Sequence, residues 1–438
     1  MPFDLPAEHV LPLLEPQGST RSMDARSAWD CLTASGDAPV VTLHDLEYFL
    51  WYQLPAKFLT SHAEHRAIAL ALGDLLEDLG YADAAALCRG PVTMHVLAEW
   101  DRGRSSGYRA LRKSLEESGV EPPDTDELAW GGIMGTVEAS VFAAAATRLE
   151  EALVAGEFTP GVRGWRRAQA EVMHRFLARP LHWLDERTPQ VAVRAERERS
   201  WAEGHSNRPL RQAFLHDVRD QIRRPRGAPE AAADRMRPLV RILEIAGARP
   251  SLTQAGYLPP RMVQEFVAEF GWEDHRPPRS EADAPVVMML MAFAKEAALV
   301  RRTRGNLGLT EVGRRAVADP AVLWEQVVKT LAAGNDFTYA VRELLLVRLL
   351  RGASERGPVE QEIESVLREA GWRPSDGGEL TRDMVSFKLW DAIRPMDLIG
   401  MLKAGEWPDR SLRLTEFGIE SARAVLWHRA TAPGQSLE

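Results

Sequence analysis

The stretch that decides the fold reads ALVRRTRGNLGLTEVGRRAV and covers Ala298–Val317. Its first residues end an apolar helix, and Arg301–Arg304 are expected to form the rising strand of a hairpin. Gly305-Asn306 are expected at the tip, where a positive φ is easily reached. Leu307–Leu309 place leucines on either side of a glycine, as in a half-buried returning strand. Thr310 follows where a helix N-cap is needed, so the sequence predicts a helix, a hairpin and a Thr-capped helix in this order.

The same pattern recurs near the C-terminus, within Asp397–Leu426. The recurring residues are two alternating leucines, a threonine and a glycine: Leu307, Leu309, Thr310 and Gly313 in the first copy, and Leu412, Leu414, Thr415 and Gly418 in the second. Upstream, Gly371-Trp372 ends an expected helix as Gly271-Trp272 does. The spacing predicts two tandem units, at residues 235–334 and 335–430.

The L-T-x-x-G signature after a hairpin resembles that of winged-helix (winged helix-turn-helix) transcription regulators, over residues 236–430. This half is also similar to uncharacterised bacterial proteins that carry LTQAGYLPP followed by LTxxGRxxxxDPxxLW. The two motifs lie here at Leu252–Pro260 and Leu309–Trp324. The resemblance implies a fold and does not carry a known activity. The expected fold is therefore mainly α, with a helical N-terminal half followed by two tandem winged-helix-like units with short β-hairpins.

The composition is that of a soluble globular protein of several domains, with 438 residues, 45% apolar and 27% charged. Two cysteines, Cys31 and Cys88, exclude a disulfide framework and a Cys-rich zinc site. The start, MPFDLPAEHV, lacks the features of a signal peptide, and no stretch reaches the roughly 20 apolar residues of a membrane span. Heavy use of arginine and alanine suggests a GC-rich bacterial genome. We expect a cytoplasmic bacterial protein with no membrane contact and no cofactor.

The middle of the chain is basic although the net charge is −9. Residues 160–227 hold 15 arginines against 8 acidic residues. Such a segment could track phosphates, dock on an acidic surface of the protein itself, or consist of solvated helix faces. We expect residues 160–234 to form a basic helical connector after a helical domain at residues 1–159, and residues 431–438 to form a tail.

Within the N-terminal domain, residues 1–40 are rich in proline and are expected to form an irregular, extended arm. An aromatic cluster follows at Tyr48, Phe49, Trp51 and Tyr52. It could stack bases or receive a partner, but aromatic residues at such spacing more often fill a core.

A search for chemistry finds no specific catalytic signature, whether for phosphate binding, dinucleotide binding, nucleophilic catalysis or redox chemistry. His62, Glu64 and His65 could contribute to a metal site, but no further ligand is indicated. The acidic residues between Glu116 and Glu127 lie in a loop run and are interpreted as solvated. We therefore expect a non-enzymatic protein with no catalytic residues and no metal, and an enzyme with catalytic residues scattered along the chain is the alternative.

The candidate nucleic-acid-binding residues lie on and beside the first hairpin. They are Arg301, Arg302, Arg304 and Asn306 along the wing, with Arg314 and Arg315 just beyond. Wings commonly touch phosphate or the minor groove, and arginine suits both. The helix before the wing, Ala284–Leu299, offers only Lys295 and Glu296 as polar side chains, which argues against direct base readout.

The second unit has a more polar helix in the equivalent position, with Lys388, Asp391, Arg394 and Asp397. Its expected wing tip, Gly405–Arg410, contains Glu406 and Asp409. This mixture is more typical of a protein-docking unit. Two hypotheses follow: a DNA-associated regulatory protein that contacts phosphate through the first wing and the basic middle, or a protein-interaction scaffold whose units bind a protein partner.

Overall fold

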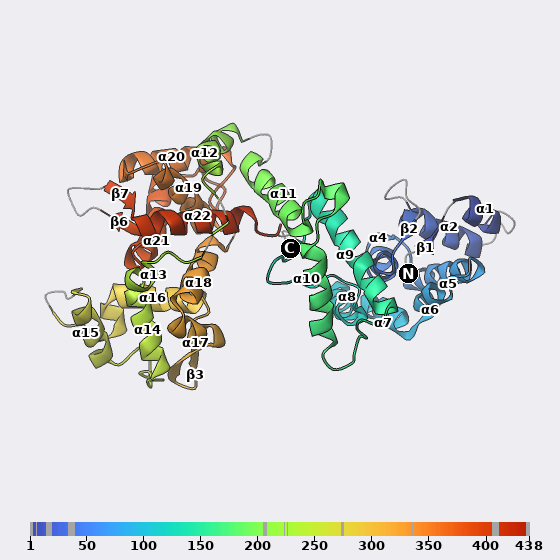
Figure 1. Cartoon of the computed structure of the whole chain (residues 1–438), viewed down its shortest axis with the longest axis horizontal. Helices are drawn as coiled ribbons and strands as arrows, with labels where there is room; N and C mark the ends of the chain where they lie inside the picture. The colour runs from blue at the N-terminus through green and yellow to red at the C-terminus, as the bar shows by residue number, and fades with distance from the viewer. Residues whose placement is uncertain are drawn as a thin grey trace. The chain divides into compact units, whose positions relative to one another are not determined.

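The computed structural model describes residues 3–5, 7–14, 20–33, 40–204, 208–222, 224–225, 227–272, 276–334, 336–404 and 411–434. The chain is mainly helical with a few short strands, as expected (Figure 1). It divides into two compact units: Met1–Glu196 with Pro433–Glu438 form unit 1, and Arg197–Ala432 form unit 2. The boundary falls within helix α11 (Pro189–Glu203), inside the stretch for which a connector is expected.

Unit 1 is a helical assembly with one short strand pair. Its elements are β1 (Phe3–Asp4), α1 (Ala7–Leu14), α2 (Thr20–Thr33), β2 (Val40–Val41), α3 (Leu43–Tyr48), the π-helical turn η1 (Phe49–Gln53), α4 (Leu54–Lys57), α5 (His62–Asp78), α6 (Ala82–Arg89), α7 (Pro91–Asp101), α8 (Arg104–Ser118), α9 (Thr136–Val154), α10 (Trp165–Ala178), the 3₁₀ turn η2 (His182–Leu184) and the first part of α11.

The expectation of an irregular N-terminal arm is wrong for the described residues. They form α1 and α2, and β1 pairs with β2 in antiparallel register. Trp29 of α2 is buried, and its indole N–H donates to the backbone oxygen of Leu5 at 3.1 Å. Burial of apolar side chains such as Leu5, Val10 and Ala28 stabilises the segment against the rest of the unit.

Two residues of the aromatic cluster lie in the core of unit 1, as the packing interpretation predicted, whereas Tyr48 is 37% exposed and Tyr52 is half-buried. Phe49 and Trp51 are buried in the continuous helical segment formed by α3, η1 and α4. The indole N–H of Trp51 donates to Oγ1 of Thr93 at 2.9 Å, and that of Trp100 donates to the backbone oxygen of Trp51 at 2.9 Å. Satisfied indole donors of this kind are typical of structural tryptophans.

Unit 2 contains two successive sets of helices, each followed by a hairpin and a further helix. Its elements are α12 (Pro209–Arg219), α13 (Ala232–Arg235), α14 (Arg237–Gly247), α15 (Pro260–Glu269), the 3₁₀ turn η3 (Glu281–Asp283), α16 (Pro285–Glu296), β3 (Val300–Thr303), β4 (Asn306–Leu309), α17 (Glu311–Ala318), α18 (Pro320–Ala332), α19 (Phe337–Leu350), β5 (Ser354–Glu355), α20 (Arg356–Glu369), α21 (Arg382–Leu398), β6 (Leu402–Ala404), β7 (Ser411–Leu414) and α22 (Glu416–Ala430).

The repeated Thr and Gly residues make the same contacts in both copies. The backbone N–H of Gly313 donates to Oγ1 of Thr310 at 2.9 Å, and that of Gly418 donates to Oγ1 of Thr415 at 2.9 Å. Each threonine N–H in turn donates at 3.0 Å to the carbonyl oxygen of the third residue after the preceding helix, Leu299 in one copy and Met401 in the other. A Cβ on either glycine would overlap that same carbonyl oxygen. Only glycine therefore lets the helix begin this close to the strand.

The strand topology also repeats. In the first copy β3 pairs with β4, and the other edge of β4 meets the segment after α14, where Ser251 bridges Asn306. In the second copy β6 pairs with β7, whose other edge meets β5, the short strand between α19 and α20. In both copies the central strand is thus the last of the three along the chain. Two copies with the same capping and strand order support an internal repeat within unit 2.

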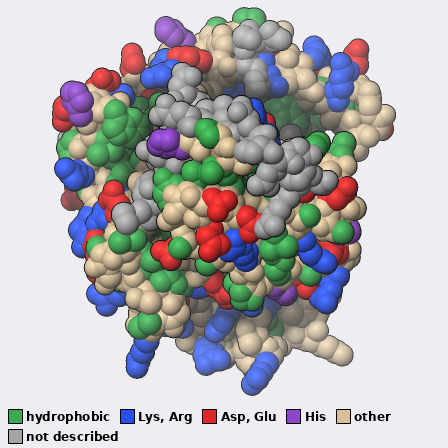
Figure 2. Space-filling model, turned by 90° about the vertical axis from the view of Figure 1, so that its right-hand side faces the viewer, with side chains coloured by type: hydrophobic (Ala, Val, Ile, Leu, Met, Phe, Trp, Pro, Cys, Tyr) green, Lys and Arg blue, Asp and Glu red, His purple; other side chains and the backbone are tan. Residues whose placement is uncertain are grey.

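The basic middle of the chain spans the boundary between the two units. Its residues divide between the two units, and several of its arginines bind groups within their own unit. Arg175 pairs with Glu157 in unit 1, and Arg211 pairs with Glu343 in unit 2. Arg197, also within this basic stretch, is buried and donates to the backbone oxygen of Thr431 at 3.0 Å. On the face drawn in Figure 2, basic, acidic and hydrophobic side chains are intermixed.

Candidate nucleic-acid interface

The hairpin of the first copy forms as predicted, but its tip lies one residue earlier than expected. Arg304 and Gly305 both have positive φ angles, 51° and 76°. Two successive residues with positive φ between paired strands are typical of a type I′ turn. Asn306 is instead the first residue of β4, and its side-chain amide donates to the backbone oxygen of Arg304 at 3.1 Å. This asparagine therefore stabilises the tip.

The register of the hairpin separates its side chains into two faces. Val300 pairs with Leu309 and Arg302 with Leu307, so these four share the inner face. Val300 and Leu307 are buried, which identifies that face as the one against the core. Arg301, Thr303, Asn306 and Gly308 lie on the outer face.

Arg302 is a structural residue as well as a candidate binding residue. Its guanidinium lies 3.5 Å from Oε1 of Glu281, a side chain that is only 3% exposed. The other carboxylate oxygen of Glu281 accepts the backbone N–H of Leu258 at 2.8 Å. Because a buried carboxylate without a countercharge is costly, removal of Arg302 would destabilise the fold.

The remaining candidate arginines are exposed around the hairpin. Within the described part of the chain, Arg301, Arg304 and Arg315 have no acidic partner. Arg314 pairs with Glu311 one turn earlier on α17, and both side chains are more than half exposed. Exposed pairs of this kind contribute about 0–1 kcal/mol, so Arg314 exchanges partners at little cost. These side chains are therefore able to meet an external anion.

The structure adds Arg249 to this set. It lies just after α14, and it lines the same surface pocket as Arg301 and Arg314. It too has no acidic partner among the described residues. Its φ of 52° is unusual for a side chain other than glycine or asparagine. In the sequence, Arg249 stands just after a helix, at a position where glycine is common. Its place beside the hairpin arises only from folding.

Helix α16 presents little polar surface, as its sequence predicted. Val287, Leu290 and Met291 are among its buried residues. Of its two polar side chains, Glu296 accepts the hydroxyl of Tyr339 at 2.7 Å. Burial and the nearby charge of Arg302 lower the pKa of Lys295. This helix lacks the row of polar groups that readout of base edges requires.

The equivalent helix of the second copy, α21, carries an exposed apolar row. Met384, Phe387 and Trp390 are 39%, 65% and 43% exposed. The guanidinium of Arg394 lies over the ring of Trp390, 4.4 Å from its centroid. The expected wing tip of this copy, Gly405–Arg410 with Glu406 and Asp409, lies outside the described residues.

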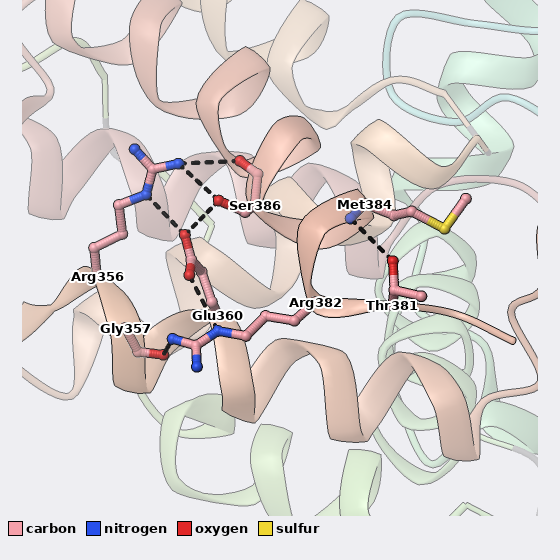
Figure 3. A network of polar contacts seen from close by, with 7 residues as sticks. All are labelled: Arg356, Gly357, Glu360, Thr381, Arg382, Met384 and Ser386. Carbon is pink, nitrogen blue, oxygen red and sulfur yellow. Dashed lines mark hydrogen bonds and ion pairs between the residues drawn. The ribbon is translucent and has the colours of Figure 1, made fainter.

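A charged network between α20 and α21 shows a contrasting arrangement (Figure 3). Buried Glu360 accepts Nε of Arg356 at 2.8 Å, Nε of Arg382 at 3.3 Å and the hydroxyl of Ser386 at 2.7 Å. Burial raises the pKa of this carboxyl, but the hydrogen bonds from Ser386 and the two arginines outweigh it and lower the pKa. These arginines serve to join two helices, whereas Arg301, Arg304 and Arg315 have no acidic partner among the described residues.

The other sequence candidates have structural partners. Nδ1 of His62 lies 2.7 Å from a carboxylate oxygen of Asp101. Among the described residues no group of three or more His, Cys, Asp or Glu is arranged to hold a metal ion. In unit 1, burial raises the pKa of Glu47 and Glu150, but these side chains are only 3% and 2% exposed, so a substrate does not reach them. None of the described helices has both the length and the apolar character needed to cross a bilayer.

Comparison of the chain with models of protein families, with curated proteins and with solved structures found no match.

Proposed function

We propose that unit 2 consists of two winged-helix units and that the protein is a non-enzymatic, DNA-associated regulator. One observation carries this proposal: Arg301, Arg304 and Arg315, on the hairpin and the helix after it, have no acidic partner in the described part of the chain. Unpaired guanidinium groups on a protruding hairpin suit the phosphate backbone of DNA.

Helix α16 and the basic middle of the chain limit the ways in which the protein would contact DNA. The apolar surface of α16 argues against base readout in the major groove, so the wing contacts phosphate or the minor groove without strong sequence preference. The basic middle has a smaller part in this proposal than the sequence suggested, because Arg175, Arg197 and Arg211 bind groups within their own units.

The second copy favours a second function, the docking of a protein partner. Its helix α21 exposes Phe387 and Trp390, and large exposed aromatic side chains are enriched at protein interfaces. If the first copy binds DNA and the second copy binds a protein partner, both hypotheses hold for the same chain.

The test is a salt series with random-sequence duplex DNA, which compares the wild type with an Arg301→Ala/Arg304→Ala variant. The logarithm of affinity falls with the logarithm of salt concentration by about 0.9 for each phosphate contacted, so the variant is expected to lose about two units of slope. Arg302 stays unchanged because of its pairing with Glu281. Arg261→Ala, on the exposed surface of α15, is the matched control and should bind as the wild type does.

Equal affinity and slope in the wild type and the double variant would reject phosphate contact by the wing. Absence of binding by the wild type at about 50 mM salt would reject the DNA-associated function itself and leave the docking of a protein as the remaining hypothesis.

A further inference from the structure

A pocket of about 300 Å³ opens beside the hairpin of the first copy. The end of α14 supplies Arg249, the outer face of β3 and β4 supplies Arg301, Thr303 and Gly308, and the first turn of α17 supplies Arg314. Its volume lies at the lower end of the range for small-molecule sites, about 300–1,000 Å³. The pocket is therefore large enough for a small metabolite.

The charged residues that line the pocket are all positive. Arg249, Arg301 and Arg314 are among its lining residues and no Asp or Glu is, and Arg314 also pairs with the exposed side chain of Glu311. The C-terminal end of α14 adds a partial negative charge of about half an electron, which the three guanidinium groups exceed. An arrangement of three guanidinium groups suits a phosphate dianion, whose oxygens accept bidentate hydrogen bonds from arginine.

The rest of the lining has space and apolar surface. A Cβ on Gly308 would meet no atom within 4 Å, so the glycine leaves the floor of the pocket open. Ala246, Leu307 and Leu309 add an apolar part to the wall, and Thr303 adds a hydroxyl. A bare phosphate ion would leave this part of the pocket unused, whereas the organic body of an ester would contact it.

Backbone strain at the rim gives independent support. Arg249 has a φ of 52°, a conformation that costs a side chain about 1 kcal/mol and in which glycine is favoured. Its backbone N–H donates to the carbonyl oxygen of Ala246 at 3.1 Å at the end of α14, whereas its side chain has no acidic partner among the described residues. Strain of this kind is concentrated at ligand-binding sites.

We infer that this pocket binds a small phosphate monoester, such as a sugar phosphate, through Arg249, Arg301 and Arg314. Arg301 is shared with the wing. If the proposed DNA contact holds, an occupied pocket draws Arg301 away from the DNA backbone, so the ligand weakens DNA binding. This consequence rests on the proposed function, whereas the ligand site itself does not.

The test is isothermal titration calorimetry of the full chain, without DNA, with ribose 5-phosphate as the probe and with inorganic phosphate and ribose as comparisons. Gly308→Ile fills the pocket and keeps every arginine, and a β-branched residue suits its strand position. Arg249→Ala removes one positive charge at the rim. Arg261→Ala, outside the pocket, is the charge-matched control.

We expect ribose 5-phosphate to bind the wild type and the control equally, and at least tenfold more weakly to Gly308→Ile and to Arg249→Ala. Ribose should not bind, and inorganic phosphate should bind more weakly than the ester. The inference would be overturned if ribose 5-phosphate bound the wild type and Gly308→Ile equally while circular dichroism showed both to be folded. It would also be overturned if the wild type gave no heat of binding at millimolar concentrations of the ester. Since no DNA is present, either result leaves the salt-series test of the wing unaffected.

Discussion

The close approach at Gly313 allows a sharp test of the repeated unit. Substitution by alanine places a Cβ against the carbonyl oxygen of Leu299, which is backbone and cannot rotate away. That oxygen also accepts the N–H of Thr310 at 3.0 Å, and the hydroxyl of Thr310 donates to the neighbouring carbonyl oxygen of Ala298 at 2.6 Å. Helix α17 would have to move away from the strand, and both hydrogen bonds would lengthen.

The magnitude follows from these contacts. Loss of two hydrogen bonds costs about 2 kcal/mol, and overpacking in a tight site costs about 1–3 kcal/mol. Alanine regains about 1 kcal/mol because it favours the helix more than glycine does. The free energy of unfolding of unit 2 should therefore fall by about 3 kcal/mol, which corresponds to a Tm lower by roughly 6–12 °C for a unit of this size.

Differential scanning calorimetry of the full chain measures this change. Gly418→Ala should behave in the same way, because its Cβ would overlap the carbonyl oxygen of Met401. Gly308→Ala, in the same hairpin as Gly313 but with no atom within 4 Å of the added Cβ, is the control and should not lower Tm. A Tm for Gly313→Ala within about 2 °C of the wild type would refute the close approach and, with it, this basis for the repeat.

Three further predictions concern stability. Glu360→Ala leaves the partly exposed Arg356 and Arg382 without their shared carboxylate, so urea unfolding should show a loss of about 2 kcal/mol at pH 7. Because the pKa of Glu360 is lowered in the fold, this loss should shrink as the pH falls below about 4, and a constant loss would contradict the pKa shift. In unit 1, burial raises the pKa of half-buried Glu121 to about 6, so its contribution to stability is lost as the pH rises through 6. Glu121→Gln should therefore stabilise the protein by about 1 kcal/mol at pH 8 and have no effect near pH 4. Stabilisation at pH 4 and none at pH 8 would refute the upward direction of the pKa shift. Thr415→Val removes the cap of α22 and should cost about 1 kcal/mol in the same unfolding assay; an unchanged midpoint would show that the cap is not formed.

Local signals were sufficient for much of the fold. The capping threonines, Thr310 and Thr415, and the glycines that follow them were recognisable because a cap needs only residues within one turn of each other. Ser61 and Glu64 form a capping box at the start of α5, another contact between residues within one turn of each other. The interpretation of the aromatic cluster as core also depended only on side-chain size and spacing.

Other predictions failed where local signals are weak. Residues before position 40 have few periodic apolar positions, and their helices are stabilised by contacts such as that of Trp29 with Leu5. The hairpin tip was misplaced by one residue because Arg304 adopts a positive φ that arginine rarely takes. The preference of glycine and asparagine for such angles pointed to Gly305-Asn306 instead.

In the candidate site, too, some features were evident from the sequence and others depended on folding. The sequence by itself determined the repeat, its hairpins and the presence of arginines on the first wing, because these depend on residues close together in the chain. Only the tertiary structure decided which arginines are available: it pairs Arg302 with Glu281, leaves Arg301 without an acid among the described residues, and brings Arg249 to the same pocket. The physical reason is that the availability of a charge depends on which acids folding brings within a few ångströms, and that proximity is not set by sequence distance.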